Sequence, residues 1–196
     1  SIDNIKDSQY IIQTPSLMER AQQGREVGYA IIAVAIIAVI FAFYKLYSLY
    51  MIGTAVRKQA SQDAADPSNP LGRVLKVGKD NFDKDIDTLE LKLAEAIMAE
   101  RPAIDQGIGF IKIISVIAPL AGLLGTVTGM IVTFQMITLY GTGDPKLMAG
   151  GISQALVTTV LGLLVAIPTS LLHSFTQSSA RGIISILEEQ STGILA

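Results

Sequence analysis

Three long apolar stretches alternate with polar segments along this chain of 196 residues. The first, residues 27–52, opens with 18 residues that carry no charge, and the second lies within a run of 31 uncharged residues that begins at Ile113. A helix needs about 20 predominantly apolar residues to cross a bilayer. The pattern therefore predicts an all-α membrane protein with transmembrane helices at residues 27–52, 113–140 and 148–174.

The polar segments are predicted to carry helices beyond the membrane. They comprise residues 1–26, 53–112, 141–147 and 175–196. Thr14-Pro15 is a helix-start signal, because Thr is a good N-cap and Pro is favoured at the first helical position. The first segment is then either a frayed tail or a helix at the membrane interface. Residues 181–189 (RGIISILEE) have an amphipathic pattern and continue the third span as a helix.

Capping signals divide residues 53–112 into helices. Asn69 is placed to cap a short helix that begins at Pro70 and runs to about Lys79. Asp87-x-x-Glu90 fits a capping box for the next helix. We expect that helix to bury one apolar face, formed by Leu89, Leu93, Ala96 and Ile97.

The same helix is expected to join the second span as one long rod that bends at Pro102. Gly107 and Gly109 lie at this join, where they give either flexibility or close packing. At the other end of the second span, a turn over residues 141–147 leads into the third span. There Asp144 is predicted as the N-cap and Pro145 as the first helical residue.

The distribution of Lys and Arg predicts how the chain crosses the membrane. Ten lie between Lys45 and Lys112, three lie in residues 1–26, and the turn of the hairpin holds only Lys146. Because an excess of Lys and Arg stays in the cytoplasm, residues 53–112 and the C-terminus are expected inside and the N-terminus outside. Interfacial aromatic residues are expected at Tyr44, Tyr47 and Tyr50, and Lys45 is expected to extend toward the lipid headgroups.

Composition excludes several classes of function. Only 16% of the residues are charged and half are hydrophobic, against about a quarter charged in a soluble domain. The net charge of −2 gives no sign of nucleic-acid binding. There is no Cys and one His, so thiolate zinc, iron–sulfur and His-rich metal sites are excluded, and no cofactor is expected. The chain begins at Ser1 rather than Met, so we expect an upstream segment in the full protein.

Small and hydroxyl-bearing residues form a stripe on each helix of the apolar hairpin. On the second span the stripe contains Gly122, Gly125 or Thr126, Gly129 and Thr133. On the third it contains Ala155, Thr159, Gly162 and Ala166, and Thr158 is adjacent. Small residues let helix backbones approach closely in lipid. The stripes therefore either only pack the helices, with each Thr bonded to its own i−4 carbonyl, or form a shared polar path.

The hairpin interior lacks ionisable groups. Charges inside spans normally mark ion pathways, so a titrating carboxylate would have to come from another chain. Pro119 and Pro168 each free a backbone carbonyl, which gives either a packing kink or a bend that widens a lumen. Gln154 is the most polar interior side chain and faces either another helix or a partner. His173 is expected at the interface rather than in a proton relay.

The segments APLAGLLGTVTGM and GGISQALVTTVLGLLVAIPT resemble the second and third spans of the ExbB/TolQ/MotA proton-channel family. The resemblance covers residues from about 71 to 189, and residues 141–159 are most similar to TtpC, an ExbB-like component of some TonB systems. Three spans with the N-terminus outside resemble the ExbB/TolQ branch, since MotA has four.

This resemblance implies a ring, a homo-pentamer around transmembrane helices of an ExbD-type partner that carries a titrating Asp. The family's pore threonines match Thr126 and Thr159, and the proline of its A-P-x-x-G-L-x-G-T motif matches Pro119. ExbB has Glu in G-I-x-E-A-L where this chain has Gln154, so a role that requires an ionised Glu is in doubt here. Polar lining candidates are Pro119, Gln154, Thr133 and Thr158, and packing candidates are Gly122, Gly125, Gly129 and Gly162.

The expected function is therefore that of a non-enzymatic proton-channel subunit in the bacterial inner membrane. With its partner and a TonB-type protein it would energise outer-membrane transport. The alternatives are a TolQ-like subunit for cell-envelope maintenance, which gene neighbours would distinguish, and a purely structural membrane scaffold. An intramembrane protease is rejected, because the spans hold no Asp and the only His lies at a helix end.

Overall fold

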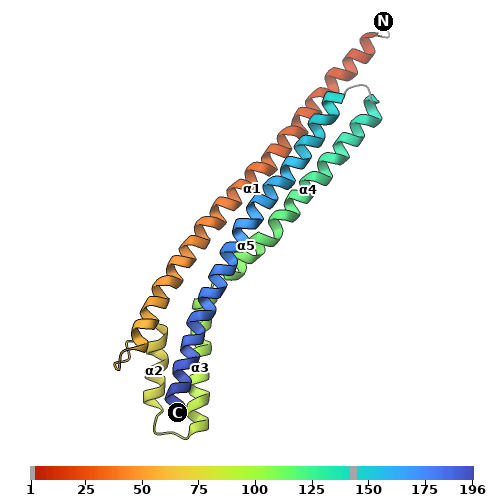
Figure 1. The fold of residues 1–196 in the computed structure, drawn as a ribbon. Helices are drawn as coiled ribbons and strands as arrows, with labels where there is room; N and C mark the ends of the chain where they lie inside the picture. Colours follow the sequence, from red (N-terminus) through yellow and green to blue (C-terminus); the bar gives the residue numbers. More distant parts are fainter. Residues whose placement is uncertain (1–2, 142–144) are drawn as a thin grey trace. The chain divides into compact units, whose positions relative to one another are not determined.

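The computed structural model describes residues 3–141 and 145–196, with side chains for residues 28–141, 145–146 and 148–196. Within these residues the regular structure is helical, with no strand, which confirms the predicted all-α class (Figure 1). The helices are α1 (Asp3–Ala60), α2 (Pro70–Asp80), α3 (Ile86–Asp105), α4 (Ile108–Tyr140) and α5 (Pro145–Leu195). The predicted ring assembly remains a prediction.

Three of the helices contain segments long and apolar enough to cross a membrane. They are Gly28–Ala60 in α1, Ile108–Tyr140 in α4 and Met148–Leu195 in α5. The three predicted spans fall in these three segments, so the number of membrane-crossing helices is confirmed, whereas the bounds of each span stay a prediction. Many large apolar side chains along them are exposed in the isolated chain, Ile40, Leu124 and Leu164 among them. A lipid environment accommodates such side chains without cost.

The chain divides into two compact units. The hairpin unit comprises Ser1–Ala38 and Ile114–Thr169, and contains the α4–α5 hairpin together with the first part of α1. The stem unit comprises Val39–Ile113 and Ser170–Ala196, and contains the end of α1, α2, α3, the start of α4 and the end of α5. Each unit has its own buried residues, as described below.

The stem unit is built around a continuous apolar core. Its buried residues are Leu49, Val56, Leu71, Val74, Leu89, Leu93, Ile97, Ile104, Ile108, Ala180, Ile183, Ile184 and Leu187. The predicted face of α3 is confirmed, since Leu89, Leu93 and Ile97 are buried and Ala96 packs against them. The end of α5 contributes Ile183 and Leu187, in agreement with the amphipathic pattern of residues 181–189.

A buried amide pair fixes the connection between α1 and α2. Gln59, with 1% of its surface exposed, donates from Nε2 to the carbonyl of Ala64 (2.7 Å). Its Oε1 accepts from the backbone N–H of Asp66 (2.9 Å) and from Asn69 Nδ2 (3.2 Å). Asn69 Oδ1 in turn accepts from the N–H of Gly72 (2.7 Å), which confirms Asn69 as the N-cap of α2.

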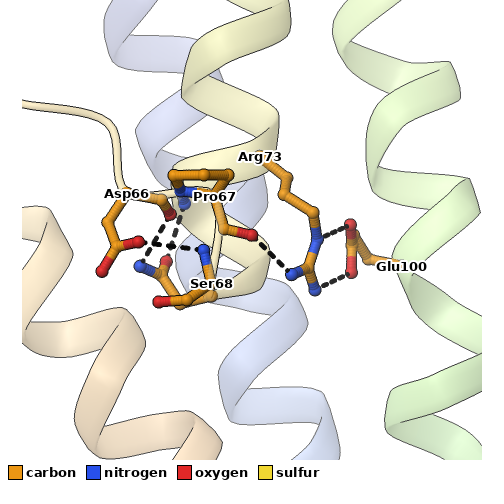
Figure 2. A network of polar contacts seen from close by, with 7 residues as sticks. Asp66, Pro67, Ser68, Arg73 and Glu100 are labelled. Atoms are coloured by element: carbon orange, nitrogen blue, oxygen red, sulfur yellow. Dashed lines mark hydrogen bonds and ion pairs between the residues drawn. The ribbon is translucent and has the colours of Figure 1, made fainter.

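An ion pair links α2 to α3 (Figure 2). Arg73 donates from Nε and Nη2 to the two carboxylate oxygens of Glu100, at 2.6 and 2.8 Å, and from Nη1 to the carbonyl of Pro67 at 2.9 Å. The Glu100 carboxylate raises the pKa of Arg73 above its ordinary value. Beside it, the backbone N–H of Ser68 lowers the pKa of Asp66. The pair is partly exposed, so its contribution is at most about 1 kcal/mol.

Replacing Gly72 with alanine should destabilise the stem unit by at least about 2 kcal/mol, at the upper part of the usual range for overpacking. A Cβ at this position would overlap the backbone carbonyl of Asp66, and a backbone group cannot rotate away as a side chain can. Thermal unfolding of the purified protein, followed by circular dichroism, measures the loss. Gly182→Ala is the matched control, because a Cβ there meets no atom within 4 Å. Equal midpoints for the two variants would contradict this prediction.

Two predicted helix starts are wrong. Helix α1 runs without interruption from Asp3, so Thr14-Pro15 lies in its interior, where the proline costs one backbone bond without ending the helix. Helix α3 begins at Ile86 and its N-cap is Asp85, whose backbone is extended, so the expected box from Asp87 to Glu90 does not form the start. Asp87 lies instead in the first turn, where its charge complements the helix dipole. Asp144, the expected N-cap of α5, lies outside the described residues.

The expected continuous rod from α3 into the second span is also interrupted. Helix α3 keeps Pro102 in its last turns and ends at Asp105, and α4 begins at Ile108. Gly107 between them has φ +84°, a left-handed conformation that ends helices and that glycine adopts without strain. Lys45 does not extend outward as expected. Only 6% of its surface is exposed, and its Nζ donates to the carbonyl of Ala103 (3.2 Å), one of the last carbonyls of α3.

Candidate functional site

In the hairpin unit, α4 and α5 touch through the two stripes of small residues. A Cβ at Gly162 would lie 2.5 Å from the carbonyl oxygen of Ala118 and 3.1 Å from the Cα of Gly122. A Cβ at Gly122 would lie 2.8 Å from the carbonyl oxygen of Thr158. These distances leave no space for a side chain at either position. The two helix backbones are therefore in direct contact at Gly122 and Gly162.

Further along the hairpin, glycines of one helix make room for side chains of the other. A Cβ at Gly125 would meet the hydroxyl of Thr158 at 2.6 Å, and one at Gly129 would meet the Cβ of Ala155 at 2.7 Å. Nearer the turn the roles of the two helices are exchanged: the glycine, Gly151, belongs to α5, and the side chain that packs against it, Thr133, belongs to α4. The stripes of the two helices thus face each other over several turns.

Three threonine hydroxyls meet where the helices are closest. Thr126 Oγ1 lies 3.2 Å from the carbonyl oxygen of Gly122, 2.9 Å from that of Ala155, and in hydrogen-bonding contact with Thr159 Oγ1. Thr158 Oγ1 lies 2.7 Å from the Ala155 carbonyl and 3.3 Å from that of Gly122, and Thr159 Oγ1 lies 3.4 Å from the latter. We call these three threonines and two carbonyls the hydroxyl cluster.

The members of the hydroxyl cluster differ in accessibility. Thr158 is buried, with 5% of its surface exposed, whereas Thr126 and Thr159 are partly exposed in the isolated chain. Each hydroxyl has one proton to donate and two lone pairs. The hydroxyl of Thr126 therefore donates to only one of its three neighbours at a time, and rotation about its C–O bond redirects the proton without moving heavy atoms. Thr126 and Thr159 are the members positioned to exchange such bonds with a group from outside the chain.

The remaining candidates lie around this cluster rather than within it. Thr133 is buried and donates to the carbonyl of Gly129 (3.0 Å), four residues earlier on its own helix, as in the packing-only interpretation. Pro119 is half-buried in α4, directly after Ala118, whose carbonyl faces Gly162. Gln154 is half-buried in α5, directly before Ala155, whose carbonyl accepts in the cluster.

Sequence reasoning missed two contact residues of the hairpin unit, the buried Thr169 and the half-buried Gly151. Thr169 has no exposed surface, and its hydroxyl lies 2.7 Å from the carbonyl of Val165 and 3.1 Å from that of Ala166. It is seven residues after Gly162, so the same helical spacing that selected the stripe would have found it. Gly151, which receives Thr133, was hidden in the Gly150-Gly151 pair, because spacing alone does not tell which of two adjacent glycines faces the partner helix.

The walls of the site are apolar and carry no charge of their own. Between Ile113 and Tyr140, and between Met148 and Leu172, the sequence has no Asp, Glu, Lys, Arg or His. Nowhere in the described part of the chain do three or more Asp, Glu or His side chains gather as a metal site. Hydroxyls and carbonyls can pass hydrogen bonds to a bound group, but they cannot hold a charge at neutral pH. A group that titrates at this site therefore has to come from outside these two spans.

Comparison with known proteins identifies relatives of this hairpin. The model of the MotA/TolQ/ExbB proton channel family matches residues 66–189. A putative biopolymer transport protein ExbB homolog of Methanothermobacter thermautotrophicus is 34% identical over 121 residues, which are 60% of this chain and 41% of the relative. The biopolymer transport protein ExbB of Aquifex aeolicus is 47% identical over 58 residues, 30% of this chain and 39% of the relative.

The biopolymer transport protein ExbB of Helicobacter pylori is 37% identical over 86 residues, 44% of this chain and 59% of the relative. In each of these comparisons the match spans less than two thirds of the relative's length. The family match includes the whole of α2, α3 and α4 and most of α5, and therefore the entire hydroxyl cluster. This multi-pass membrane chain belongs to the MotA/TolQ/ExbB proton channel family.

Proposed function

We propose that the chain is an ExbB-like proton-channel subunit that uses the proton motive force to energise TonB-dependent transport across an outer membrane. The observation that carries this proposal is the hydroxyl cluster, which brings three hydroxyls together between two spans that carry no charged side chain. The membership in a proton channel family and the ExbB names of the relatives support it.

The titrating group in this proposal is an Asp on a transmembrane helix of an ExbD-type partner. A neutral carboxyl group tolerates an apolar wall better than a carboxylate does. Protonation would therefore release the Asp from the hydroxyls of Thr126 and Thr159 and let its helix move past the apolar surface of α4 and α5. Deprotonation would return it to the hydroxyls, which donate to a carboxylate. Gln154, where ExbB has Glu, would contribute a hydrogen bond but no proton.

The proposed assembly is a homo-pentamer around the partner helices in the bacterial inner membrane, with a TonB-type protein as the output. Residues 1–26 and the turn at 141–147 would lie in the periplasm. Residues 53–112 and 175–196 would lie in the cytoplasm, an orientation that the excess of Lys and Arg in the first of these segments favours. The mass of the detergent-solubilised complex with its partner tests the copy numbers, and a stable monomer would refute the ring.

Proton flux into liposomes tests the function itself. Vesicles containing this chain and an ExbD-type partner, loaded with a pH-sensitive dye, should acidify when a pH gradient is applied, and vesicles containing this chain alone should not. A partner with its membrane Asp replaced by Asn is the control, because it assembles without a titrating group. Equal flux with Asp and Asn would exclude the partner carboxylate as the carrier, and assembly without any flux would favour a structural scaffold.

A bacterial strain that lacks the gene separates the TonB-linked role from a TolQ-like one. Loss of TonB-dependent nutrient uptake with an intact envelope is expected from the proposal. Sensitivity to detergents with normal uptake would instead assign the chain to cell-envelope maintenance. The similarity to TtpC is consistent with the TonB-linked role and stays a prediction.

A further inference from the structure

The short joint between α3 and α4, inside the stem unit, is covered by one face of α1. Gly107 forms the joint with its left-handed backbone, and the ring of Phe41 occupies the space where a Cβ of Gly107 would lie. The same ring packs edge-on against Phe110 in the first turn of α4, with centroids 5.5 Å apart and an interplanar angle of 84°. Phe41 therefore contacts both the joint and the helix that follows it.

One helical turn further along α1, Lys45 reaches the helix that precedes the joint. Its Nζ donates to the carbonyl of Ala103 at 3.2 Å, and the nearby Asp105 interacts favourably with its charge. The last turn of α3 contains no basic residue of its own. A helix C-terminus carries a partial negative charge and favours a cation near its final carbonyls. Lys45 supplies that cation from a different helix.

The burial of Lys45 makes this contact more than a surface ion pair. A lysine with 6% of its surface exposed has lost most of its hydration, and a buried charge is tolerated only where it is paired and hydrogen-bonded. Ile104 and Ile108, on either side of the joint, belong to the core of the stem unit. The joint thus has buried apolar residues on both sides, an aromatic ring beside its glycine, and a cation on the Ala103 carbonyl near the end of α3.

We infer that Phe41 and Lys45 form a clasp that turns the α3–α4 joint from a flexible glycine hinge into a fixed elbow. Glycine alone would leave the joint free to change its backbone angles. With the Phe41 ring against Gly107 and the Lys45 ammonium on Ala103, a change of angle would require breaking both contacts. The clasp couples α1 to α3 and to the start of α4, so a displacement of any one of them is passed to the other two. This role does not depend on proton transport.

Hydrogen exchange of the full chain in lipid nanodiscs, followed by mass spectrometry, tests the clasp. In the Lys45→Met variant, peptides covering residues 103–111 should exchange about tenfold faster, which corresponds to about 1.4 kcal/mol of lost protection. A hydrogen bond to a charged group contributes on this scale. Peptides from α2, residues 70–80, should keep their protection, because the change is local to the joint. The Phe41→Leu variant, which keeps an apolar side chain, should also speed up hydrogen exchange in peptides covering residues 103–111.

Two further variants make the result specific. Lys45→Arg keeps the charge and should retain most of the protection, whereas Lys92→Met removes a partly exposed lysine of α3 and should change nothing at the joint. Unchanged exchange at residues 103–111 in both Lys45→Met and Phe41→Leu would overturn the clasp. Equally faster hydrogen exchange in the α2 peptides would also overturn it, because Lys45 would then stabilise the whole stem unit rather than this joint.

Discussion

Replacing Gly162 with alanine should weaken the α4–α5 hairpin by about 1–3 kcal/mol, the usual cost of overpacking. The new methyl group would lie 2.5 Å from the carbonyl oxygen of Ala118 and 3.1 Å from the Cα of Gly122, and both neighbours are backbone atoms. The helices would have to move apart by several tenths of an ångström. That separation would lengthen the bonds between Thr126 on one helix and Ala155 and Thr159 on the other.

Unfolding of the purified protein by increasing amounts of a denaturing detergent, followed by circular dichroism, measures this loss. Gly150→Ala is the matched control in the same helix, because a Cβ there meets no atom within 4 Å and alanine is the better helix former. Gly122→Ala should also destabilise, since its Cβ would lie 2.8 Å from the carbonyl oxygen of Thr158. If the Gly162→Ala and Gly150→Ala variants unfolded at the same detergent content, the α4 and α5 backbones could not be in direct contact at Gly162.

The double variant Gly122→Ala/Gly162→Ala provides an internal test of the geometry. Because the two glycines face each other, the first alanine forces a separation that makes room for the second. The combined loss of stability should therefore be smaller than the sum of the single losses, since changes at residues in contact are not additive. Simple additivity would mean that the two positions act at separate contacts.

The helices and the spans could be predicted because they depend on local properties of the chain. An uncharged run longer than a bilayer core leaves few alternatives to a membrane helix. The cap at Asn69 and the apolar face of α3 were also readable, since both follow from residue type at fixed helical spacing. The facing stripes of α4 and α5 were found for the same reason, although spacing could not decide between Gly125 and Thr126.

The features that escaped prediction depend on contacts between segments far apart in sequence. Lys45 was expected among headgroups because the end of α3, which binds it, is 58 residues away. The role of Gly107 was open from sequence, since a glycine gives either flexibility or close packing. Its left-handed backbone ends α3, and the Phe41 ring packs closely against it. In the same way, sequence could not tell that Thr158 is covered by Gly125 while its neighbour Thr159 stays partly exposed.

The double variant Thr126→Val/Thr159→Val should reduce partner-dependent proton flux in liposomes by at least about tenfold. Valine keeps the shape of threonine and removes the hydroxyl, so the proposed partner carboxylate would lose its donors. A hydrogen bond to a charged group contributes about 1.5–3 kcal/mol, and each 1.4 kcal/mol added to a barrier slows a step about tenfold. The losses of flux in the two single variants, expressed as free energies and added, should exceed the loss in the double variant. The reason is that the two hydroxyls already bond each other, so each single variant also disturbs the other hydroxyl.

Thr128→Val is the control for this experiment, because it makes the same chemical change on another face of α4. Thr128 is exposed and its hydroxyl bonds only carbonyls of its own helix, those of Leu124 at 2.8 Å and Gly125 at 3.1 Å. Its replacement should leave proton flux and TonB-dependent uptake unchanged. If the Thr126/Thr159 variant assembled with its partner and conducted as well as Thr128→Val, the hydroxyls would serve only to pack α4 against α5. The proton path would then have to lie on another surface of the chain.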